Sequence, residues 1–360
     1  MTQPHPHIAC MSPYALANLD APEGKTLISL SQNESLRPPS PKATEAAAQA
    51  LGSSMLYPDP DWTDLRHALA ELHGIDPDGI LCGNGSLDLI GCLARVFAGP
   101  DRAVLAPAHA YPFFQTAAQV TNARFDPAAE VDAVVSVDAM LASVQPDTGI
   151  VFVANPGNPT GTRIPKAELV RLRQGLRPDI LLVIDEAYGE FSDHLGERCF
   201  DLVQGGNTVV LRTFSKAYGM AGFRVGWGLF PPAIARELRK VMNPNNVPAS
   251  AQIAAAAAVR DDAYMRETCA ITASLRDQAT AQLKQAGFAP YPSFTNFVLL
   301  NMGSTEAAAS ADQRLRSEGV FLRPQGGAGL PHTLRMTVGP QAALVKAIEI
   351  LTQWKQEGQI

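Results

Sequence analysis

Short apolar runs alternate with segments of helical spacing over the first 250 residues. The runs have the length and composition of buried strands: GILCG, RAVLA, GIVFVANP, DILLVIDEAY, NTVVLRTFSK and VGWGLF. Between the runs, residues 40–52 are Ala-rich, and TDLRHALAELHG begins with a hydroxyl residue suited to cap a helix. The alternation predicts an open α/β sheet, in which ligands bind outside the carboxyl ends of the strands.

The pattern changes beyond about residue 250. A long Ala-rich helix is predicted through ITASLRDQATAQLKQAG, followed by three apolar segments with strand character, FTNFVLLNM, GVFLRPQ and TLRMTVG, and a closing helix, PQAALVKAIEILTQWKQ. Residues 1–29 contain Pro and His without a clear period. We therefore expect an N-terminal arm (1–29), a large domain (30–250) and a small α+β domain (251–360), with a site between the two domains.

Composition narrows the class of ligand. The chain has 360 residues, a net charge of −6 and no Lys/Arg block, which argues against nucleic acid and anionic membranes as partners and leaves small molecules. The N-terminus has no signal-peptide pattern, and the most apolar helical run, 251–259, is too short to span a bilayer. Five scattered cysteines form no metal-binding pattern, so we expect a reducing, cytoplasmic setting and no metal.

The first motif with chemical potential is DEAYGEF, in which Asp185 follows a run of apolar residues. A carboxylate that emerges at the end of a buried strand is costly to desolvate unless a cation pairs with it. Asp after a strand is also a common helix N-cap, and that interpretation alone explains the residue equally well.

A second motif, NPGNPTG, follows the strand predicted in GIVFVANP. Its prolines and glycines are typical of a tight crossover turn. A turn does not explain Asn158, whose amide can both donate and accept hydrogen bonds at this strand end.

The third motif is RTFSKAYGMAGFRVGW. Thr213 and Ser215 supply hydroxyl groups and Arg224 a guanidinium, a set suited to a phosphate dianion. Most loop lysines are simply solvated, but Lys216 has few polar neighbours, and desolvation would lower its pKa and make the amine a usable nucleophile.

The fourth motif, GNGSLDLIG, lies between a strand and a helix, where backbone amides can hold a phosphate. Its third glycine is not at the spacing of a dinucleotide-binding fingerprint, and no acidic residue ends a second strand about 20 residues later. The motif therefore favours a phosphate site without a nicotinamide cofactor.

Together the motifs describe a pocket for a phosphorylated, protonated heterocycle bound covalently by lysine, a description that pyridoxal 5'-phosphate meets. The sequence resembles the fold-type I aminotransferases of class I/II, and within them the histidinol-phosphate aminotransferase branch. The resemblance runs nearly end to end, through IACMSPY, NESLRPPSP, YPDP, GNGS, AYPFF, NPGNPTG, DEAYGEF, RTFSKAYGMAGFRVGW, TNFVLL, VFLRP and GLPHTLRMTVG. It implies a three-layer α/β/α large domain with a mostly parallel sheet, plus a smaller α+β domain.

The resemblance also implies a role for each matched residue. Lys216, Asp185 and Tyr188 would be catalytic: Lys216 binds the cofactor and moves the proton, and Asp185 pairs with the pyridinium nitrogen. Tyr188 and Asn158 would bind the ring's phenolic oxygen. The remaining cofactor contacts would come from Tyr111, stacked on the ring, and from the phosphate ligands Ser86, Leu87, Thr213, Ser215 and Arg224.

Further implied roles concern the substrate and a second subunit. Arg335 matches an arginine that grips the substrate carboxylate, Arg323 matches a position used for a substrate phosphate, and Asn158 is also assigned to substrate binding. Tyr57 matches a residue that reaches the neighbouring subunit's cofactor phosphate, which implies a homodimer with shared sites.

The sequence departs from the family pattern on the substrate side. NESLRPPSP stands where the family has N-E-N-P-x-G-P-S-P, Leu87 replaces an acidic residue, and Ala328 replaces a bulky aromatic one. Arg37 in the altered loop raises the hypothesis of an acidic or phosphorylated substrate.

We expect an aminotransferase that exchanges an amino group between an amino acid or amine phosphate, such as histidinol phosphate, and a keto acid such as 2-oxoglutarate. A lyase on the same scaffold, resembling threonine-phosphate decarboxylase, is the alternative. Which bond at the α-carbon breaks depends on substrate orientation, which the sequence does not report.

Overall fold

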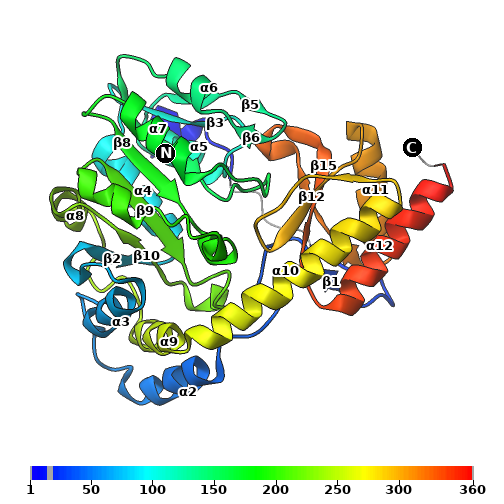
Figure 1. Cartoon of the computed structure of the whole chain (residues 1–360), viewed down its shortest axis with the longest axis horizontal. Coiled ribbons are helices and arrows are strands. Elements are labelled where there is room, and N and C mark those ends of the chain that lie inside the picture. Colours follow the sequence, from blue (N-terminus) through cyan, green and yellow to red (C-terminus); the bar gives the residue numbers. More distant parts are fainter. Residues whose placement is uncertain (1, 14–18, 359–360) are drawn as a thin grey trace.

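The computed structural model describes residues 2–13 and 19–358. The large domain is built on a seven-stranded sheet with the order β2-β10-β9-β8-β7-β3-β4, in which only β10 runs antiparallel to its neighbours (Figure 1). In that order the strands are Ile80–Gly83, Gly226–Leu229, Thr208–Thr213, Leu181–Asp185, Thr148–Ala154, Ala103–Pro107 and Phe125–Ala128. The structure confirms an α/β fold with a mostly parallel sheet.

Six of these strands fall in the apolar runs that predicted them, and β4 does not. Its sequence, FDPA, is polar and contains a proline, which sheets tolerate at an edge. It lies at the edge of the sheet beside β3. A small hairpin of β5 (Glu130–Val131) and β6 (Val134–Val135) follows it.

Helices flank the sheet of the large domain (Figure 1). They are α2 (Pro41–Ala50), α3 (Thr63–His73), α4 (Ser86–Phe97), α5 (Phe113–Val120), α6 (Val137–Ala142), α7 (Lys166–Gly175), α8 (Pro232–Arg239) and α9 (Ala249–Arg260). The start of α3 differs from the prediction, because Thr63 is its first helical residue and not its cap. The Asp59 carboxylate accepts the Thr63 amide at 2.7 Å instead.

The small domain contains a four-stranded antiparallel sheet with the order β11-β12-β15-β14. Its strands are Ala289–Pro290, Phe297–Asn301, Leu330–Thr337 and Arg323–Gln325, and its helices are α10 (Asp262–Gln285), α11 (Thr305–Ser317) and α12 (Gln341–Gln356). The segment GVFLRPQ forms two strands, β13 (Val320–Phe321) and β14, and β13 pairs in parallel with β1 (Ile28–Ser29). The end of the predicted arm is therefore a strand of the small domain.

The single long helix predicted beyond residue 250 is two helices, α9 and α10, which meet at Asp261. Asp261 leaves helical geometry, with φ −101° and ψ 41°, and its carboxylate pairs with Lys42 at 2.7 Å. Short polar side chains such as Asp favour breaks of this kind. Figure 1 shows α10 running from α9 toward the helices of the small domain.

Two apolar cores suggest where the domains divide. The first core, around the seven-stranded sheet, includes Ala251 and Val259 of α9, whereas the second core, around the four-stranded sheet, includes Leu30 and begins within α10 at Ala279. We therefore propose a domain boundary within α10, later than residue 250, with residues 28–30 attached to the small domain.

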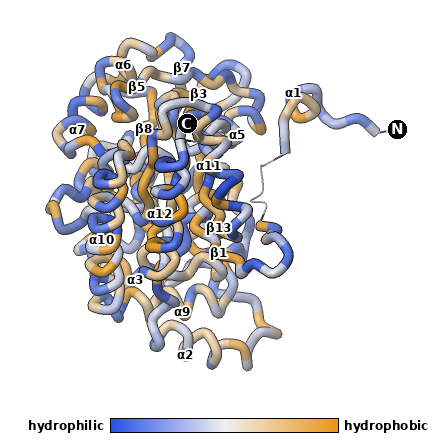
Figure 2. Tube along the Cα trace, turned by 90° about the vertical axis from the view of Figure 1, so that its right-hand side faces the viewer, coloured by the Kyte–Doolittle hydropathy of each residue, from blue (hydrophilic) through white to orange (hydrophobic). Residues whose placement is uncertain are grey.

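The remaining elements are short. Helix α1 (Pro6–Ala9) contacts α5 and stands at the edge of the molecule in Figure 2. The single-turn helices are η1 (Leu51–Ser53), η2 (Pro77–Gly79), η3 (Gly189–Phe191), η4 (Asp193–Leu195), η5 (Phe200–Gly205), η6 (Ala221–Phe223) and η7 (Gly326–Ala328). Within the described ranges, no helix combines the length and apolar content needed to cross a membrane.

Candidate active site

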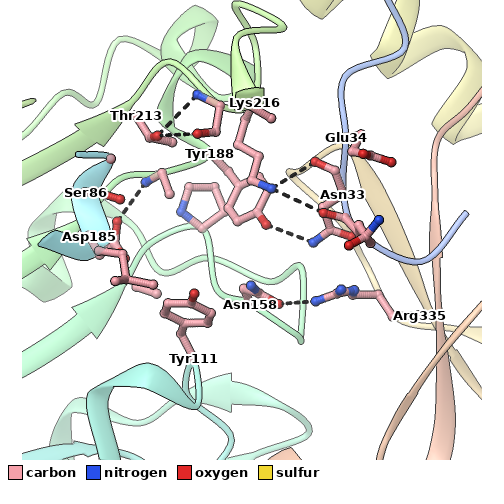
Figure 3. A pocket seen from close by; sticks show the side chains of 18 of the residues that line it. Asn33, Glu34, Ser86, Tyr111, Asn158, Asp185, Tyr188, Thr213, Lys216 and Arg335 are labelled. Atoms are coloured by element: carbon pink, nitrogen blue, oxygen red, sulfur yellow. Dashed lines mark hydrogen bonds between the residues drawn. The ribbon is translucent and has the colours of Figure 1, made fainter. Parts of the chain in front are cut away.

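A cavity of about 390 Å³ lies between the two domains, at the carboxyl ends of the large-domain strands. It brings together most of the residues singled out in the sequence, and Figure 3 shows their side chains converging on it. The predicted residues that line the cavity are Ser86, Leu87, Tyr111, Asn158, Asp185, Tyr188, Thr213, Ser215, Lys216, Arg224, Arg323 and Arg335.

Lys216 follows β9 and extends into the cavity (Figure 3). Its Nζ donates to the backbone carbonyl of Asn33 at 2.9 Å. Burial, together with the positive charges of Arg335 and Arg224, lowers the pKa of the Lys216 amine to about 7, although Glu34 opposes the shift. A lysine with such a pKa is substantially neutral near neutral pH, as a nucleophile must be.

Asp185 ends β8 and is 4% exposed. Its Oδ1 accepts the backbone amide of Ala187 at 3.1 Å, and no Lys, Arg or His among the described residues forms an ion pair with it. Burial raises the pKa of this carboxyl group to about 7, and the neighbouring Glu186 adds to the rise. A buried acid of this kind fits a cationic partner in the cavity, as the pyridinium nitrogen of pyridoxal phosphate would be.

Groups suited to bind a phosphate gather where α4 begins. Gly85 precedes the helix with φ 80° and has no side chain to cap it, so the first amides, including those of Ser86 and Leu87, face the cavity. Arg224 approaches from the other side, with Nη1 at 3.4 Å from Ser215 Oγ, and Thr213 Oγ1 lies 3.1 Å from the same oxygen. Helix amides, hydroxyls and a guanidinium together suit a phosphate dianion.

Two glycines permit this close arrangement. A Cβ on Gly85 would lie 2.7 Å from Arg224 Nη2, and a Cβ on Gly226 would lie 2.3 Å from the Ser86 amide nitrogen. Any side chain at either position would displace the phosphate donors. The residues present therefore fit the phosphorylated cofactor that the sequence predicted.

The side chains of Asn158 and Tyr188 are held by partners outside the loops that carry these two residues. Asn158 Oδ1 accepts from Arg335 Nη1 at 2.6 Å, and Arg335 Nη2 also donates to the backbone carbonyl of Ser31 at 3.0 Å. The Tyr188 hydroxyl accepts from Asn33 Nδ2 at 2.8 Å, and its ring packs edge-on against Phe297. Both cavity side chains are thus oriented by the small domain or by the segment that leads into it.

Tyr111 lines the cavity from the loop that precedes α5. Its ring makes an edge contact with Phe114, with the centroids 6.0 Å apart. This packing places an aromatic ring beside the cavity, where it can stack on a planar cofactor.

Two arginines from neighbouring strands of the small domain line the same cavity. Arg323 on β14 and Arg335 on β15 are directly opposite each other in the strand register. Like charges in this relation are unfavourable unless an anion lies between or beside them. The small-domain wall is therefore suited to an anionic group.

Two predicted site residues do not line the cavity. Arg37 donates to Glu267 at 2.6 Å and stacks over the Tyr264 ring at 4.0 Å, and both partners belong to α10. Tyr57, which was predicted to reach the site of a second subunit, is 88% exposed in the segment after η1. Arg37 is engaged by α10, which could not be foreseen because its partner is more than 200 residues away in the sequence.

Asn33 is a site residue that our interpretation of the sequence missed. It is 1% exposed and contacts both Lys216 and Tyr188. NESLRPPSP drew attention as a departure from a family pattern, but Asn33 itself matches that pattern. The local sequence around a single loop asparagine does not indicate how many hydrogen-bond partners its side chain has in the folded protein.

A buried charge cluster behind the cavity was also missed. Arg212 is fully enclosed and its guanidinium binds Glu186 at 2.8 Å and Asp193 at 2.7 Å, with Glu190 at 3.4 Å. Burial raises the pKa of Glu190 to about 7; Arg212 opposes this rise, and the neighbouring carboxylate of Asp193 adds to it. The cluster holds the turn after Asp185, because Glu186 is the next residue along the chain. Among the described residues, no group of acidic, His or Cys side chains could hold a metal ion.

Comparisons with known proteins agree with this geometry. The family model for aminotransferase class I and II matches residues 25–351. The histidinol-phosphate aminotransferase of Paramagnetospirillum magneticum is 42% identical over 93% of this chain and 94% of that protein, and the enzyme of the same name from Rhodospirillum centenum is 38% identical over 98% of both.

A solved structure is similar over nearly the whole chain. The crystal structure of histidinol-phosphate aminotransferase from Sinorhizobium meliloti, in complex with pyridoxal-5'-phosphate, has a TM-score of 0.91 and 30% identity and covers 99% of this chain and 98% of that one. These similarities favour transamination over the lyase alternative. The chain therefore belongs to the aminotransferase class I and II family, and it is an aminotransferase that uses pyridoxal phosphate.

Proposed function

We propose that this enzyme transfers the amino group of histidinol phosphate, or of a closely related amine phosphate, to a keto acid such as 2-oxoglutarate. The observation that carries the proposal is the pair of arginines, Arg323 and Arg335, opposite each other on β14 and β15 at the cavity wall. The named activity of the full-length relatives supports the same donor.

The arginine pair suits both halves of the reaction. A phosphate monoester carries up to two negative charges, and a dicarboxylic keto acid carries the same number, so one cationic wall can serve donor and acceptor in turn. Arg335 is already held by Asn158 and by the carbonyl of Ser31, which leaves its planar fork in a defined orientation. We assign the anionic group of each substrate to this wall.

The other residues divide the chemistry among them. Pyridoxal phosphate, when bound, supplies the ring that accepts electrons from the substrate α-carbon. Lys216 would hold the cofactor covalently, and its free amine would move the proton at the substrate α-carbon. Asp185 would keep the ring nitrogen protonated, and Tyr188 and Asn158 would hold the ring oxygen.

We also propose that the enzyme is a homodimer. The segment after α2 exposes a run of large apolar side chains: Leu51 is 63% exposed, Met55 83%, Leu56 65% and Tyr57 88%. Several large apolar side chains exposed within one short segment favour a protein partner. A second copy of this chain is the partner we propose, with Tyr57 reaching the phosphate site of that copy. The five free cysteines favour a reducing, cytoplasmic location.

The substrate proposal is tested with the purified holoenzyme and amino donors that differ in one group. The loss of visible absorbance of the Lys216-linked cofactor is followed with histidinol phosphate, with histidinol, and with a neutral aromatic amino acid. We expect histidinol phosphate to react with a kcat/KM at least about 100-fold above that of histidinol, because two charge-assisted contacts are lost without the phosphate.

A matched variant identifies the residues responsible. Arg323→Gln should lower the kcat/KM for histidinol phosphate by about tenfold or more and leave that for histidinol nearly unchanged. Equal reactivity of the two donors with the wild-type enzyme would overturn the choice of substrate. An equal loss for both donors in the variant would remove Arg323 from the phosphate site.

The dimer is tested by sedimentation at several protein concentrations. Met55→Asp should shift the equilibrium toward the monomer, since a charge would be buried in the interface. Val131→Asp is the control, because Val131 is also exposed (64%) but lies in the β5–β6 hairpin. A monomeric wild-type protein, or the same shift for both variants, would contradict the proposal.

A further inference from the structure

We propose that Asn33 is a positioning residue that directs the hydroxyl proton of Tyr188 toward the cofactor. The inference rests on the proposed contact between Tyr188 and the ring oxygen of pyridoxal phosphate. Asn33, from the N-terminal segment, would act together with the cofactor-binding residues at the strand ends. This role is separate from substrate binding.

Asn33 is held in one orientation by its surroundings. It is 1% exposed and has φ 54°, a left-handed conformation that asparagine tolerates better than most residues. Its backbone amide donates to Thr337 Oγ1 at 2.9 Å, and its carbonyl accepts from Asn296 Nδ2 at 3.1 Å. Both partners belong to the small domain.

The contact with Thr337 also identifies the two side-chain atoms of Asn33. Thr337 Oγ1 accepts the Asn33 amide proton and donates its own proton to Asn33 Oδ1, which is 3.2 Å away. Oδ1 is assigned as the acceptor on that side, with the NH₂ group on the other side. Asn33 Nδ2 then lies 2.8 Å from the Tyr188 hydroxyl.

In this arrangement the hydroxyl proton of Tyr188 has one direction. An amide nitrogen can only donate, so the Tyr188 oxygen is the acceptor in its contact with Asn33. The hydroxyl proton must then point away from Asn33. Because Tyr188 lines the cavity, we place this proton on the side where the cofactor's ring oxygen would lie.

Asn33 also contacts the reacting amine. Its backbone carbonyl accepts from Lys216 Nζ at 2.9 Å (Figure 3). One residue thus joins Lys216 and Tyr188, from the large-domain sheet, to Thr337 and Asn296 of the small domain. The orientation of Tyr188 is coupled in this way to the contact between the two domains.

A pH titration of the holoenzyme's visible absorbance tests the inference. The absorbance reports protonation of the link between Lys216 and the cofactor, and a donor to the ring oxygen stabilises its deprotonated form. In Asn33→Asp the carboxylate would accept the Tyr188 proton and withdraw it from the cofactor. We expect the titration midpoint to rise by about one pH unit, the size of one charge-assisted hydrogen bond.

The same substitution is then made in a Tyr188→Phe background, so that the coupling between the two residues is measured. Tyr188→Phe alone should also raise the midpoint, and Asn33→Asp should add less than half of its original shift there. Equal shifts in both backgrounds would overturn the role of Asn33, since the effect would then come from charge alone. An unchanged midpoint in Tyr188→Phe would instead overturn the Tyr188 contact on which the inference rests.

Asn33→Gly is the second variant. Glycine accepts the left-handed conformation, keeps the carbonyl that binds Lys216 and adds no charge. A smaller rise, of about 0.3 pH units, is expected and should disappear in the Tyr188→Phe background. If Asn33→Asp fails to fold or to bind the cofactor, this pair decides the question: a rise that persists without the hydroxyl, or no rise at all, contradicts the inference.

Discussion

The two walls of the cavity are built in different ways. The cofactor wall comes from a single sheet: Asp185 and Thr213 end neighbouring strands, and Ser86 begins the helix after a third. The substrate wall is assembled from residues 31–34 and from the strands β14 and β15. About 290 residues of sequence lie between residues 31–34 and β14. The first wall is fixed by the backbone of one domain, whereas the second depends on how two domains meet.

This difference has a consequence for specificity. Close contacts around Gly85 and Gly226 leave the cofactor wall little freedom to change. The substrate wall consists mostly of side chains on loops and on a small sheet, where substitutions alter contacts without disturbing the main fold. We expect variants of the first wall to abolish the reaction and variants of the second wall to alter substrate preference.

The largest effect is expected for Lys216→Ala, which removes both the covalent link and the proton carrier. The rate of the half-reaction with an amino donor should fall by about 10⁴-fold or more. The phosphate site should still hold the cofactor, which ultrafiltration and absorbance can show. A variant that retains more than about 1% of the wild-type rate would contradict the assignment.

Asp185→Asn tests the electrostatic part of the cofactor wall. We expect kcat to fall by about 10²–10³-fold, because the ring nitrogen loses its anionic partner. Cofactor binding should weaken less, since the phosphate donors and Lys216 are unchanged. A fall of less than about tenfold would show that the ring nitrogen does not depend on this carboxylate.

The same substitution should have the opposite effect on the stability of the cofactor-free protein. Burial holds the pKa of Asp185 at about 7, above its ordinary value of 3.8, so the folded chain binds more protons than the unfolded chain between these values. The contribution of Asp185 to stability therefore falls as the pH rises from about 4 to about 7. Denaturant titrations should show that the free energy of unfolding of Asp185→Asn rises relative to that of the wild type over this range. The same pH dependence of unfolding in both proteins would argue against the raised pKa.

Arg335→Lys tests the substrate wall. Lysine keeps the charge but loses the planar fork, so kcat/KM for anionic substrates should fall by about 10- to 100-fold. Cofactor affinity should change less than about threefold, which separates this wall from the first. Arg323→Lys makes the same arginine-to-lysine exchange on the neighbouring strand and is the matched comparison. A loss of cofactor in Arg335→Lys would mean that the two walls are not independent.

The smallest effect is expected for Arg37→Ala. Its guanidinium pairs with Glu267, which is 60% exposed, and such pairs contribute about 0–1 kcal/mol. Activity should fall by less than about threefold, and equally for anionic and neutral donors. A selective loss for anionic donors would restore the hypothesis, drawn from the sequence, that Arg37 contacts the substrate.

Much of the cofactor wall could be predicted because its signals are local. Asp185, Asn158 and Lys216 each follow an apolar run, and parallel strands carry such residues to one edge of a sheet. The strands with continuous apolar sequence were predicted, whereas β4, with its Asp and Pro, was not. The break at Asp261 was missed because the three charged residues around it, Arg260, Asp261 and Asp262, can equally lie on the exposed face of a continuous helix.

The sequence by itself determined the α/β fold, the family and the cofactor, because each follows from short motifs and from hydrophobic periodicity. The tertiary structure decided which side chains complete the substrate wall. It directed Arg37 to α10, placed Arg323 opposite Arg335, and gave Asn33 partners in both domains. These outcomes depend on strand register and on contacts between segments up to 304 residues apart, which no local pattern encodes.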